Sequence, residues 1–269
     1  MSQASGAVRV PVLMYHRVEP TVAREEAPYA VSRNQFAAHI SWLADHGWRP
    51  CTLHAFDAWL AGREALPERS VLITFDDGFA GLHEHVLPLL AGRGWPATVF
   101  LVSGLIGRRD TWISREGGRA ARHPLLDRGQ IAEMAVAGFE FHSHSVSHLD
   151  LTVLDDAALH DEVAGSRAAL QDLLGTAVDS FAYPFGRHHE RVRAAVQAAG
   201  YRLAFGVAPG FNRRLQDAYA IRRLDITGGD TPTRFGRKVA LGTNDGSALA
   251  QWRYLATRVG ARLGLGASA

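Results

Sequence analysis

The stretch Val71-Leu72-Ile73-Thr74-Phe75-Asp76-Asp77-Gly78 joins an apolar run to two adjacent carboxylates. The run has the β-branched and aromatic content of a buried strand, and Gly78 allows the turn that ends it. Neighbouring side chains on an extended segment point to opposite sides, so Asp76 and Asp77 are expected to have different partners. One carboxylate can bind a metal ion while the other faces a water molecule. A surface turn that caps the next helix is the alternative, and the preceding apolar run argues against it.

A second strand-like run, Phe139-Glu140-Phe141, leads into His144-Ser145-Val146-Ser147-His148. The two histidines are four residues apart, which places both imidazoles on one side if the segment turns helically. One carboxylate and two imidazoles can hold a divalent ion and leave room for water. Single histidines are usually ordinary core or surface residues, but a pair at this spacing directly after a strand favours metal binding. His142 is expected to belong to the strand, with a packing or supporting role.

Strand-like and helix-like patterns alternate along the rest of the chain. Apolar, β-branched or aromatic runs predict strands over residues 10–15, 71–75, 98–102, 139–142, 181–183 and 201–207. Helical spacing and capping signals predict helices over residues 35–45, 56–60, 82–91, 127–138, 155–174 and 190–199. Asn34 is the expected cap of the first helix. This alternation indicates a mainly parallel sheet, either open or closed into a barrel.

The candidate residues for chemistry all follow separate predicted strands: His16, the Asp76-Asp77 pair, His144 and Tyr183. A (β/α) barrel builds its active site where strand ends converge on one face, so we expect a distorted (β/α) barrel. A single catalytic domain is expected over residues 1–269, with a core over about 10–224 and a C-terminal helical extension over about 232–263. Residues 108–124 are polar and rich in Gly and Arg, and are expected to form an exposed loop over the barrel mouth.

The composition of the 269 residues is that of an ordinary globular protein, with 47% hydrophobic and 21% charged residues. The formal net charge is only +2, and basic residues occur at most in pairs, which argues against a nucleic-acid-binding surface. The only cysteine, Cys51, cannot form an intramolecular disulfide and is expected to be a packed structural thiol.

The sequence also bears on where in the cell the protein is located. No segment reaches transmembrane length and no signal peptide is evident, so a cytoplasmic protein is expected, although a chain trimmed of its leader would look the same. Residues 249–263 carry an apolar stripe, which predicts a helix packed on the barrel. A helix lying on a membrane surface, which would suit a lipid-linked saccharide, is the alternative.

Taken in order, these motifs resemble those of the polysaccharide deacetylase family, the fourth carbohydrate esterase family. Thr74–Gly78 matches the first motif of that family, His144–His148 matches the second, and Phe181-Ala182-Tyr183-Pro184-Phe185-Gly186 is similar to the third. The resemblance extends from Val10 to about Leu224. The opening segment, Val12-Leu13-Met14-Tyr15-His16-Arg17-Val18, resembles the subgroup that deacetylates glucosamine units of bacterial exopolysaccharide.

The resemblance implies a role for each motif residue. It implies Asp77, His144 and His148 as the metal ligands and Asp76 as the general base. It also implies that the backbone N–H of Tyr183 helps to hold the tetrahedral oxyanion.

Two family features are absent from their usual places. The wider family supplies its general acid from a late Leu-x-His motif, but this chain has Leu224-Asp225-Ile226 there, which leaves His16 as the candidate. A histidine bonded to the backbone at a strand end is the alternative for His16. Many relatives carry an Arg early in the third motif that is thought to tune the base, and Ala182 and its neighbours supply none.

These residues predict a metal-dependent hydrolase that removes N-acetyl groups from an amino-sugar-containing saccharide. The mixed nitrogen and oxygen ligand set favours Zn²⁺, and Co²⁺, Ni²⁺ or Fe²⁺ could occupy such a site. A deformylase or another amide hydrolase that acts on a lipid-linked or small sugar is the enzymatic alternative. A carbohydrate-binding relative without activity is the alternative of another class, but a binding module needs no general base.

Overall fold

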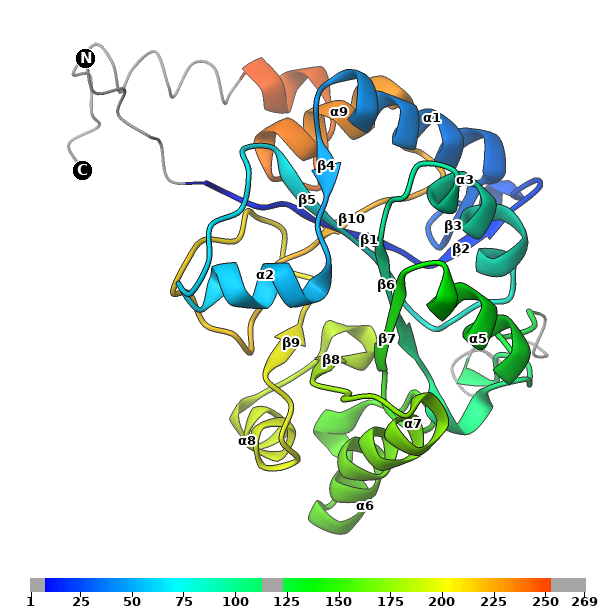
Figure 1. The fold of residues 1–269 in the computed structure, drawn as a ribbon, viewed down its shortest axis with the longest axis vertical. Coiled ribbons are helices and arrows are strands. Elements are labelled where there is room, and N and C mark those ends of the chain that lie inside the picture. Colours follow the sequence, from blue (N-terminus) through cyan, green and yellow to red (C-terminus); the bar gives the residue numbers. More distant parts are fainter. Residues whose placement is uncertain (1–7, 113–122, 253–269) are drawn as a thin grey trace.

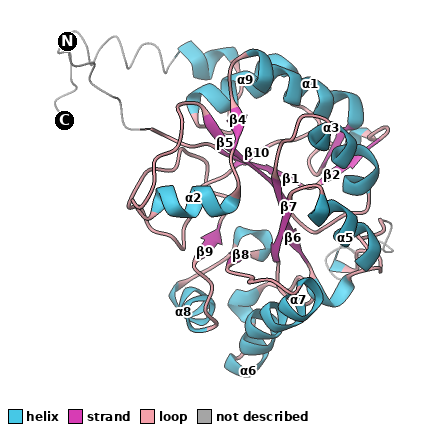
Figure 2. Cartoon of the chain, in the orientation of Figure 1, coloured by secondary structure: helices cyan, strands magenta, loops and turns pink. Residues whose placement is uncertain are grey.

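The computed structural model describes residues 8–112 and 123–252. Parallel strands form one sheet that curls into a half-barrel, with helices around its outside (Figure 1 and Figure 2). The order along the sheet is β10 (Leu224–Asp225), β1 (Val12–Tyr15), β5 (Ser70–Phe75), β6 (Ala97–Leu101), β7 (Phe139–Ser143), β8 (Ser180–Ala182) and β9 (Leu203–Phe205). The short strand β4 (Arg49–Pro50) also pairs with β5, and β2 (Arg17–Glu19) pairs separately with β3 (Ala30–Ser32). The expected distorted (β/α) barrel is confirmed.

Most of the helices lie between strands in sequence and pack outside the sheet, whereas α9 follows β10. They are α1 (Arg33–Asp45), α2 (Leu53–Leu60), α3 (Leu87–Ala91), α5 (Arg128–Val136), α6 (Asp156–His160), α7 (Ser166–Leu174), α8 (Glu190–Ala198) and α9 (Pro232–Leu241). Two π-helical segments extend this set: Leu82–Val86 precedes α3, and Asp161–Gly165 joins α6 to α7. Single 3₁₀ turns are formed by Arg24–Glu26, Ser103–Leu105, Leu151–Val153 and Pro184–Gly186.

Side-chain caps explain where two of the helices begin. The hydroxyl of Ser32 accepts a hydrogen bond from the N–H of Gln35, so Ser32 caps α1 and the expectation for Asn34 was wrong. Asn34 lies within the first turn because the chain becomes helical at Arg33. At α5 the expected capping box is present, with Asp127 and Gln130 each bonded to the backbone of the other.

Two apolar layers hold the sheet in place. The outer layer lies between the sheet and its helices and includes Phe36, Phe75, Phe141 and Phe181. The inner layer fills the barrel with side chains that include Val12, Leu72, Phe100, Phe205 and, from α2, Phe56 and Trp59. Because α2 supplies part of the inner layer, it plugs the barrel from one side instead of covering the sheet from outside.

The half-barrel is nearly closed by irregular backbone. The N–H of Ile221 donates to Ala204 O at 2.9 Å, and the N–H of Gly206 donates to Ile221 O at 3.0 Å. Ile221 therefore pairs with β9 just before the chain enters β10, whose residues pair with β1. The two edges of the sheet are brought together by one short segment of the chain.

The structure bears on three smaller expectations. Cys51 is a packed thiol: it donates to Val71 O, and burial raises its pKa to about 12. No helix within residues 8–112 and 123–252 is both long and apolar enough to cross a bilayer. The expected C-terminal helix beyond Trp252 lies outside the described residues, as does the middle of the expected loop over residues 108–124.

Replacing Phe100 by Ala should destabilise the protein strongly, because this fully buried ring packs against Phe205 in the inner layer. We expect the free energy of unfolding to fall by about 3–5 kcal/mol, measured by urea denaturation. Val136→Ala is the control, since Val136 is almost fully exposed and should unfold like the wild type. A similar loss in both variants would contradict the assignment of Phe100 to the barrel core.

Candidate active site

Asp77, His144 and His148 come together at the carboxyl ends of β5 and β7. Their ligand atoms all lie within 4.8 Å of one another, and all three side chains are buried. Asp77 Oδ1 lies 3.5 Å from His144 Nε2 and 3.4 Å from His148 Nε2. Parallel strands end at one face of the barrel, which is why residues so far apart in the sequence meet here.

The chemistry of these three side chains fits a divalent metal ion. Asp77 Oδ1 is buried and has no hydrogen-bond partner among the described residues. Burial and the negative charges of Asp76 and Asp110 raise the pKa of Asp77 well above its usual range. Burial lowers the pKa of His144 to about 4, so its imidazole is neutral and can donate a lone pair. A bound cation would satisfy the carboxylate and both imidazoles at once.

The backbone of β8 orients His144. The Nδ1–H of His144 donates to Ala182 O at 2.8 Å, which leaves the lone pair on Nε2 facing Asp77 and His148. This hydrogen bond fixes both the tautomer and the rotation of the ring, as is usual for metal-binding histidines.

The backbone is strained at Asp77 and in the turn between His144 and His148. Asp77, Ser145 and His148 have φ values of 72°, 66° and 53°, in the left-handed region that non-glycine residues rarely adopt. The Ser145 hydroxyl accepts a hydrogen bond from the N–H of His148 at 3.0 Å. Strain of this kind persists only where surrounding contacts enforce it, and it concentrates at functional sites.

Glu162 supplies much of that enforcement. Its carboxylate accepts hydrogen bonds from the N–H of Val146 at 3.0 Å, from the N–H of Ser147 at 2.9 Å and from the Ser147 hydroxyl. Glu162 lies on the π-helical segment between α6 and α7, and such segments often mark functional sites. Sequence reasoning missed Glu162, because one more acidic residue in a long polar helix carries no local signal.

Asp76 lies beside these ligands and has a different partner, as the alternation along the strand predicts. Arg223 Nη1 donates to Asp76 Oδ1 at 2.6 Å and Nη2 donates to Oδ2 at 2.8 Å. Arg223 is fully buried, and its Nε donates to Gly206 O at 2.8 Å. Paired hydrogen bonds of this geometry are among the strongest a carboxylate can make.

Arg223 is the main group that lowers the pKa of Asp76. Burial alone would raise the pKa of Asp76, but the charges of Arg223 and His144 and the hydrogen bonds from Arg223 outweigh it and hold this pKa at about 2. The sequence showed only an ordinary Arg222-Arg223 pair. No strand was predicted from the sequence near Arg223, so the sequence carried no signal for its role.

His16 lies at the end of β1, next to β10, which carries Asp225. Burial lowers the pKa of His16, while the negative charges of Asp76 and Asp225 act in the opposite direction. His16 Nδ1 and Asp225 Oδ1 are both buried and without a hydrogen-bond partner among the described residues. The candidate acid therefore lies in the field of two carboxylates.

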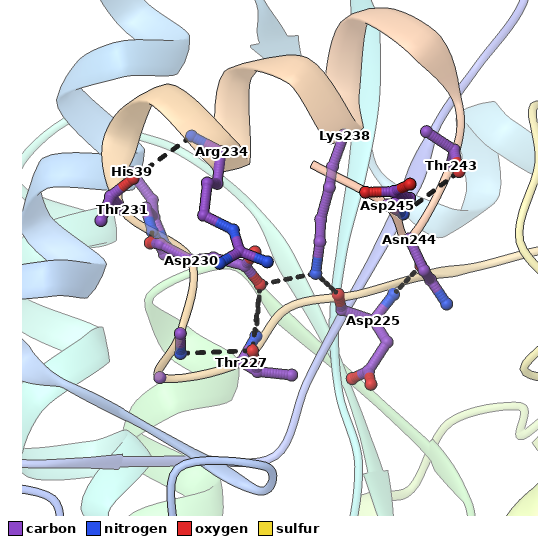
Figure 3. A network of polar contacts seen from close by, with 12 residues as sticks. His39, Asp225, Thr227, Asp230, Thr231, Arg234, Lys238, Thr243, Asn244 and Asp245 are labelled. Atoms are coloured by element: carbon purple, nitrogen blue, oxygen red, sulfur yellow. Dashed lines mark hydrogen bonds and ion pairs between the residues drawn. The ribbon is translucent and has the colours of Figure 1, made fainter. Parts of the chain in front are cut away.

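The backbone of Asp225 is anchored by the polar network in Figure 3. Lys238 Nζ donates to Asp225 O at 2.7 Å and to Asp230 Oδ2 at 2.6 Å, and the N–H of Asp225 donates to Asn244 Oδ1 at 2.9 Å. Asp230 Oδ2 also accepts a hydrogen bond from the N–H of Thr227. These contacts hold the segment after β10 against α9, and so fix the backbone that carries the Asp225 carboxylate.

The comparison with known families agrees with this geometry. The family model described as polysaccharide deacetylase matches residues 63–204, more than half of the chain. The chain belongs to the polysaccharide deacetylase family.

Individual relatives extend the likeness over most of the chain. YxkH of Bacillus subtilis (strain 168) is 29% identical over 228 residues, which are 85% of this chain and 75% of YxkH. The poly-β-1,6-N-acetyl-D-glucosamine N-deacetylase of Staphylococcus aureus (strain MSSA476) is 25% identical over 235 residues, 80% of this chain and 78% of that protein. The structure of IcaB from Ammonifex degensii is 29% identical and has a TM-score of 0.72, over 88% of this chain and 97% of IcaB.

The third polysaccharide deacetylase motif corrects the expectation for Tyr183. Its N–H donates to Phe205 O at 3.0 Å, continuing the pairing of β8 with β9, so it is already engaged. Phe185, two residues later, has a φ of 57°, and its ring lies 4.5 Å from the ring of His148. No hydrogen bond from the N–H of Phe185 to another described residue is seen. Phe185 is therefore the better candidate for the oxyanion donor.

One described end of the segment over residues 108–124 reaches the candidate metal ligands of this member of the polysaccharide deacetylase family. Trp112 is buried, and its ring lies 4.5 Å from the ring of His148, which is thus flanked by Trp112 and Phe185. Asp110 is fully buried, and its carboxylate accepts a hydrogen bond from the N–H of His123 at 3.0 Å. Asp110 and Trp112 are buried, whereas Arg108, Arg109, Thr111 and Pro124 are exposed, as expected for a surface loop.

His142 is placed away from the active site. It belongs to β7, as expected, and lines a cavity of about 420 Å³ with the first residues of three strands, Phe139, Ser180 and Leu203. Because these residues begin β7, β8 and β9, the cavity lies at the amino ends of the strands, opposite the candidate metal ligands. Burial lowers the pKa of His142 to about 4.

Removing the charge of Arg223 should change the acid side of the pH–rate profile. In the wild type Asp76 is ionised at any pH well above about 2, so its titration should not limit turnover near neutrality. Arg223→Gln removes the main pKa-lowering partner, so the pKa of Asp76 rises and activity should fall already at mildly acidic pH. The measurement is kcat/KM from pH 4 to 9.

Arg222→Gln is the matched control, since Arg222 is exposed and should keep the wild-type profile. An unchanged acid limb in a folded Arg223→Gln protein would show that Arg223 does not set the ionisation of Asp76.

Glu162→Gln should weaken metal binding without touching a metal ligand. The neutral side chain cannot accept all three hydrogen bonds as well, so the strained turn that presents His148 should loosen. We expect an affinity for Co²⁺ roughly 10- to 100-fold lower, by absorbance titration. Glu133→Gln, an exposed residue bonded to His83, should bind Co²⁺ like the wild type. Equal affinities in both variants would contradict the role of Glu162.

Proposed function

We propose that this member of the polysaccharide deacetylase family is a metal-dependent N-deacetylase acting on an N-acetylated amino-sugar polymer. The observation that carries the proposal is the buried Asp77–His144–His148 group beside a carboxylate that Arg223 keeps ionised. The Staphylococcus aureus relative, which is named for poly-β-1,6-N-acetyl-D-glucosamine, supports a substrate of this kind. A catalytic unit over the whole chain, residues 1–269, is part of the proposal.

Asp77, His144 and His148 would hold a divalent ion. When bound there, it supplies the positive charge that polarises an amide carbonyl and makes water more acidic. Two neutral imidazoles and one carboxylate suit Zn²⁺ well, and Co²⁺, Ni²⁺ and Fe²⁺ accept the same donors.

Asp76 is proposed as the general base. Arg223 occupies one lone-pair direction of each Asp76 oxygen, and the remaining lone pairs can accept the proton of the attacking water. The low pKa of Asp76 ensures that the carboxylate is ionised before each turnover. The partner that orients this side chain therefore also keeps it unprotonated.

His16 is proposed as the general acid that gives a proton to the departing nitrogen. An amine leaves poorly unless it is protonated, so the group beside it must carry a proton at the right moment. Asp225 and Asp76 favour the imidazolium form of His16, which opposes the effect of burial.

The backbone N–H of Phe185, in place of that of Tyr183, is proposed to donate to the carbonyl oxygen as negative charge develops there. A preorganised N–H contributes most when it is not already used, and the N–H of Tyr183 is engaged with Phe205 O.

The function is tested by acetate and formate release from N-acylated saccharides by Zn²⁺- or Co²⁺-loaded protein. Asp76→Asn should keep its metal but lose turnover by about 10²- to 10⁴-fold, because only the base is removed. His148→Ala should lose both metal and activity. Acetate release supports the proposal, and formate release alone would favour a deformylase. Normal turnover by Asp76→Asn would show that the base has been misassigned.

A further inference from the structure

Tyr29 is one of two exposed Phe, Trp or Tyr residues in the described part of the chain. Its side chain is 63% exposed, and the only other exposed aromatic residue within residues 8–112 and 123–252 is Trp252, at 72%. An exposed aromatic ring beside a reactive centre is informative, because burying it against a ligand releases apolar surface from water.

Tyr29 lies directly against the candidate acid. The centroid of its ring is 6.3 Å from that of His16, and the two rings meet edge to face at 87°. Aromatic pairs favour this arrangement. With one edge contact made, much of the Tyr29 ring remains open to solvent, next to the position from which His16 would protonate the leaving nitrogen.

The backbone of Tyr29 is held firmly in this place. Its N–H donates to Glu26 O at 2.9 Å, and its carbonyl accepts from the N–H of Arg17 at 3.2 Å. Arg17 follows His16 directly, so the two aromatic residues are anchored to the same strand, β2.

The loop that contains Thr227 and Asp230, drawn in Figure 3, packs against the segment that carries Tyr29. The N–H of Gly228 donates to Ala27 O at 2.7 Å, and a Cβ added at Gly228 would lie only 2.7 Å from Ala30 O. This loop follows Asp225 and is tied to α9 by Asp230 and Lys238. The network that anchors Asp225 therefore also supports the backbone around Tyr29. A surface side chain without a role would not need such support.

The proposed reaction puts a sugar ring within reach of Tyr29. The leaving nitrogen is bonded to a ring carbon of the amino sugar, so that ring must lie beside His16 during proton transfer. A pyranose presents an apolar face of C–H groups with partial positive charge, which complements the negative face of an aromatic ring. Tyr29 has such a face free and is pre-positioned by backbone contacts.

We propose that Tyr29 is a saccharide-binding subsite, on which the pyranose that carries the amide, or the pyranose next to it, stacks. The inference rests on the proposed function and deepens it, since it names a sugar chain in a defined place and not merely an amide as the substrate. Tyr29 acts by binding the sugar and takes no part in the proton transfers.

The test compares Tyr29→Ala, Tyr29→Leu and Tyr29→Trp on a β-1,6-linked N-acetylglucosamine pentamer. Loss of one stacking contact should raise KM about 3- to 10-fold with a much smaller change in kcat. Tyr29→Trp should restore KM because it keeps an aromatic face. Tyr29→Leu should behave like Tyr29→Ala, since it can pack against His16 but cannot stack in the same way. Trp252→Ala is the control for an exposed aromatic residue, and its KM should be unchanged.

A purely structural role would give a different result. If Tyr29 only supported His16, Tyr29→Leu would preserve activity and Tyr29→Ala would lower kcat with KM unchanged. Either of these outcomes overturns the subsite. Calorimetric titration of the pentamer into Asp76→Asn and Asp76→Asn/Tyr29→Ala gives a second readout without turnover. A dissociation constant raised by the same factor in the double variant supports the subsite, and equal constants overturn it.

The binding readout also separates this inference from the proposed function. Wild-type protein that binds the pentamer through Tyr29 but releases no acetate would leave the subsite standing and refute the deacetylase. Acetate release that is indifferent to Tyr29 would do the reverse.

Discussion

The bidentate ion pair between Arg223 and Asp76 connects the fold to the chemistry. Arg223 lies beside β10, Asp76 ends β5, and the third hydrogen bond of the guanidinium reaches Gly206 after β9. One buried side chain thus joins both edges of the half-barrel to a central strand. Breaking such a pair would leave a charge without a partner in the interior, which costs about 3–5 kcal/mol. The contact that completes the barrel is therefore also the contact that keeps the candidate base ionised, and neither function can be altered alone.

The candidate metal ligands depend on a second kind of constraint, which is enforced backbone strain. Asp77 and His148 adopt left-handed conformations that β-carbon sterics disfavour, and they do so because neighbouring groups leave no alternative. Glu162 holds the turn before His148 from a helix on the outside of the barrel, while the carbonyl of Ala182 orients His144 from the next strand. The surrounding packing and hydrogen bonds offset this strain and keep Asp77, His144 and His148 close together. This arrangement explains why an acidic residue without access to substrate is expected to affect metal affinity.

The candidate site has two sides, one around His148 and one around His16. On one side the aromatic rings of Trp112 and Phe185 flank His148, and on the other the exposed ring of Tyr29 lies beside His16, whose pKa the charges of Asp76 and Asp225 raise against the effect of burial. The rings of Trp112 and His148 are buried, whereas that of Tyr29 is exposed, which agrees with our proposal that the sugar lies on the Tyr29 side. The polar network around Lys238 anchors the backbone of Asp225, so α9 contributes to the fold and also supports the side of the site that we propose meets the saccharide.

The sequence by itself determined the fold class and predicted the candidate metal ligands and their neighbour Asp76, because these follow from local patterns: an apolar run, a carboxylate pair and a histidine spacing at strand ends. It could not identify Arg223, Glu162 or the N–H of Phe185. Each of these acts through a contact between segments far apart in the chain, or through a backbone hydrogen bond that only strand pairing assigns. The pairing of β8 with β9 engages the N–H of Tyr183 and so decides against it, although the motif alone favoured that residue. Tertiary structure decided these points because charge compensation and hydrogen-bond satisfaction depend on which groups share a buried space, and local sequence does not record that.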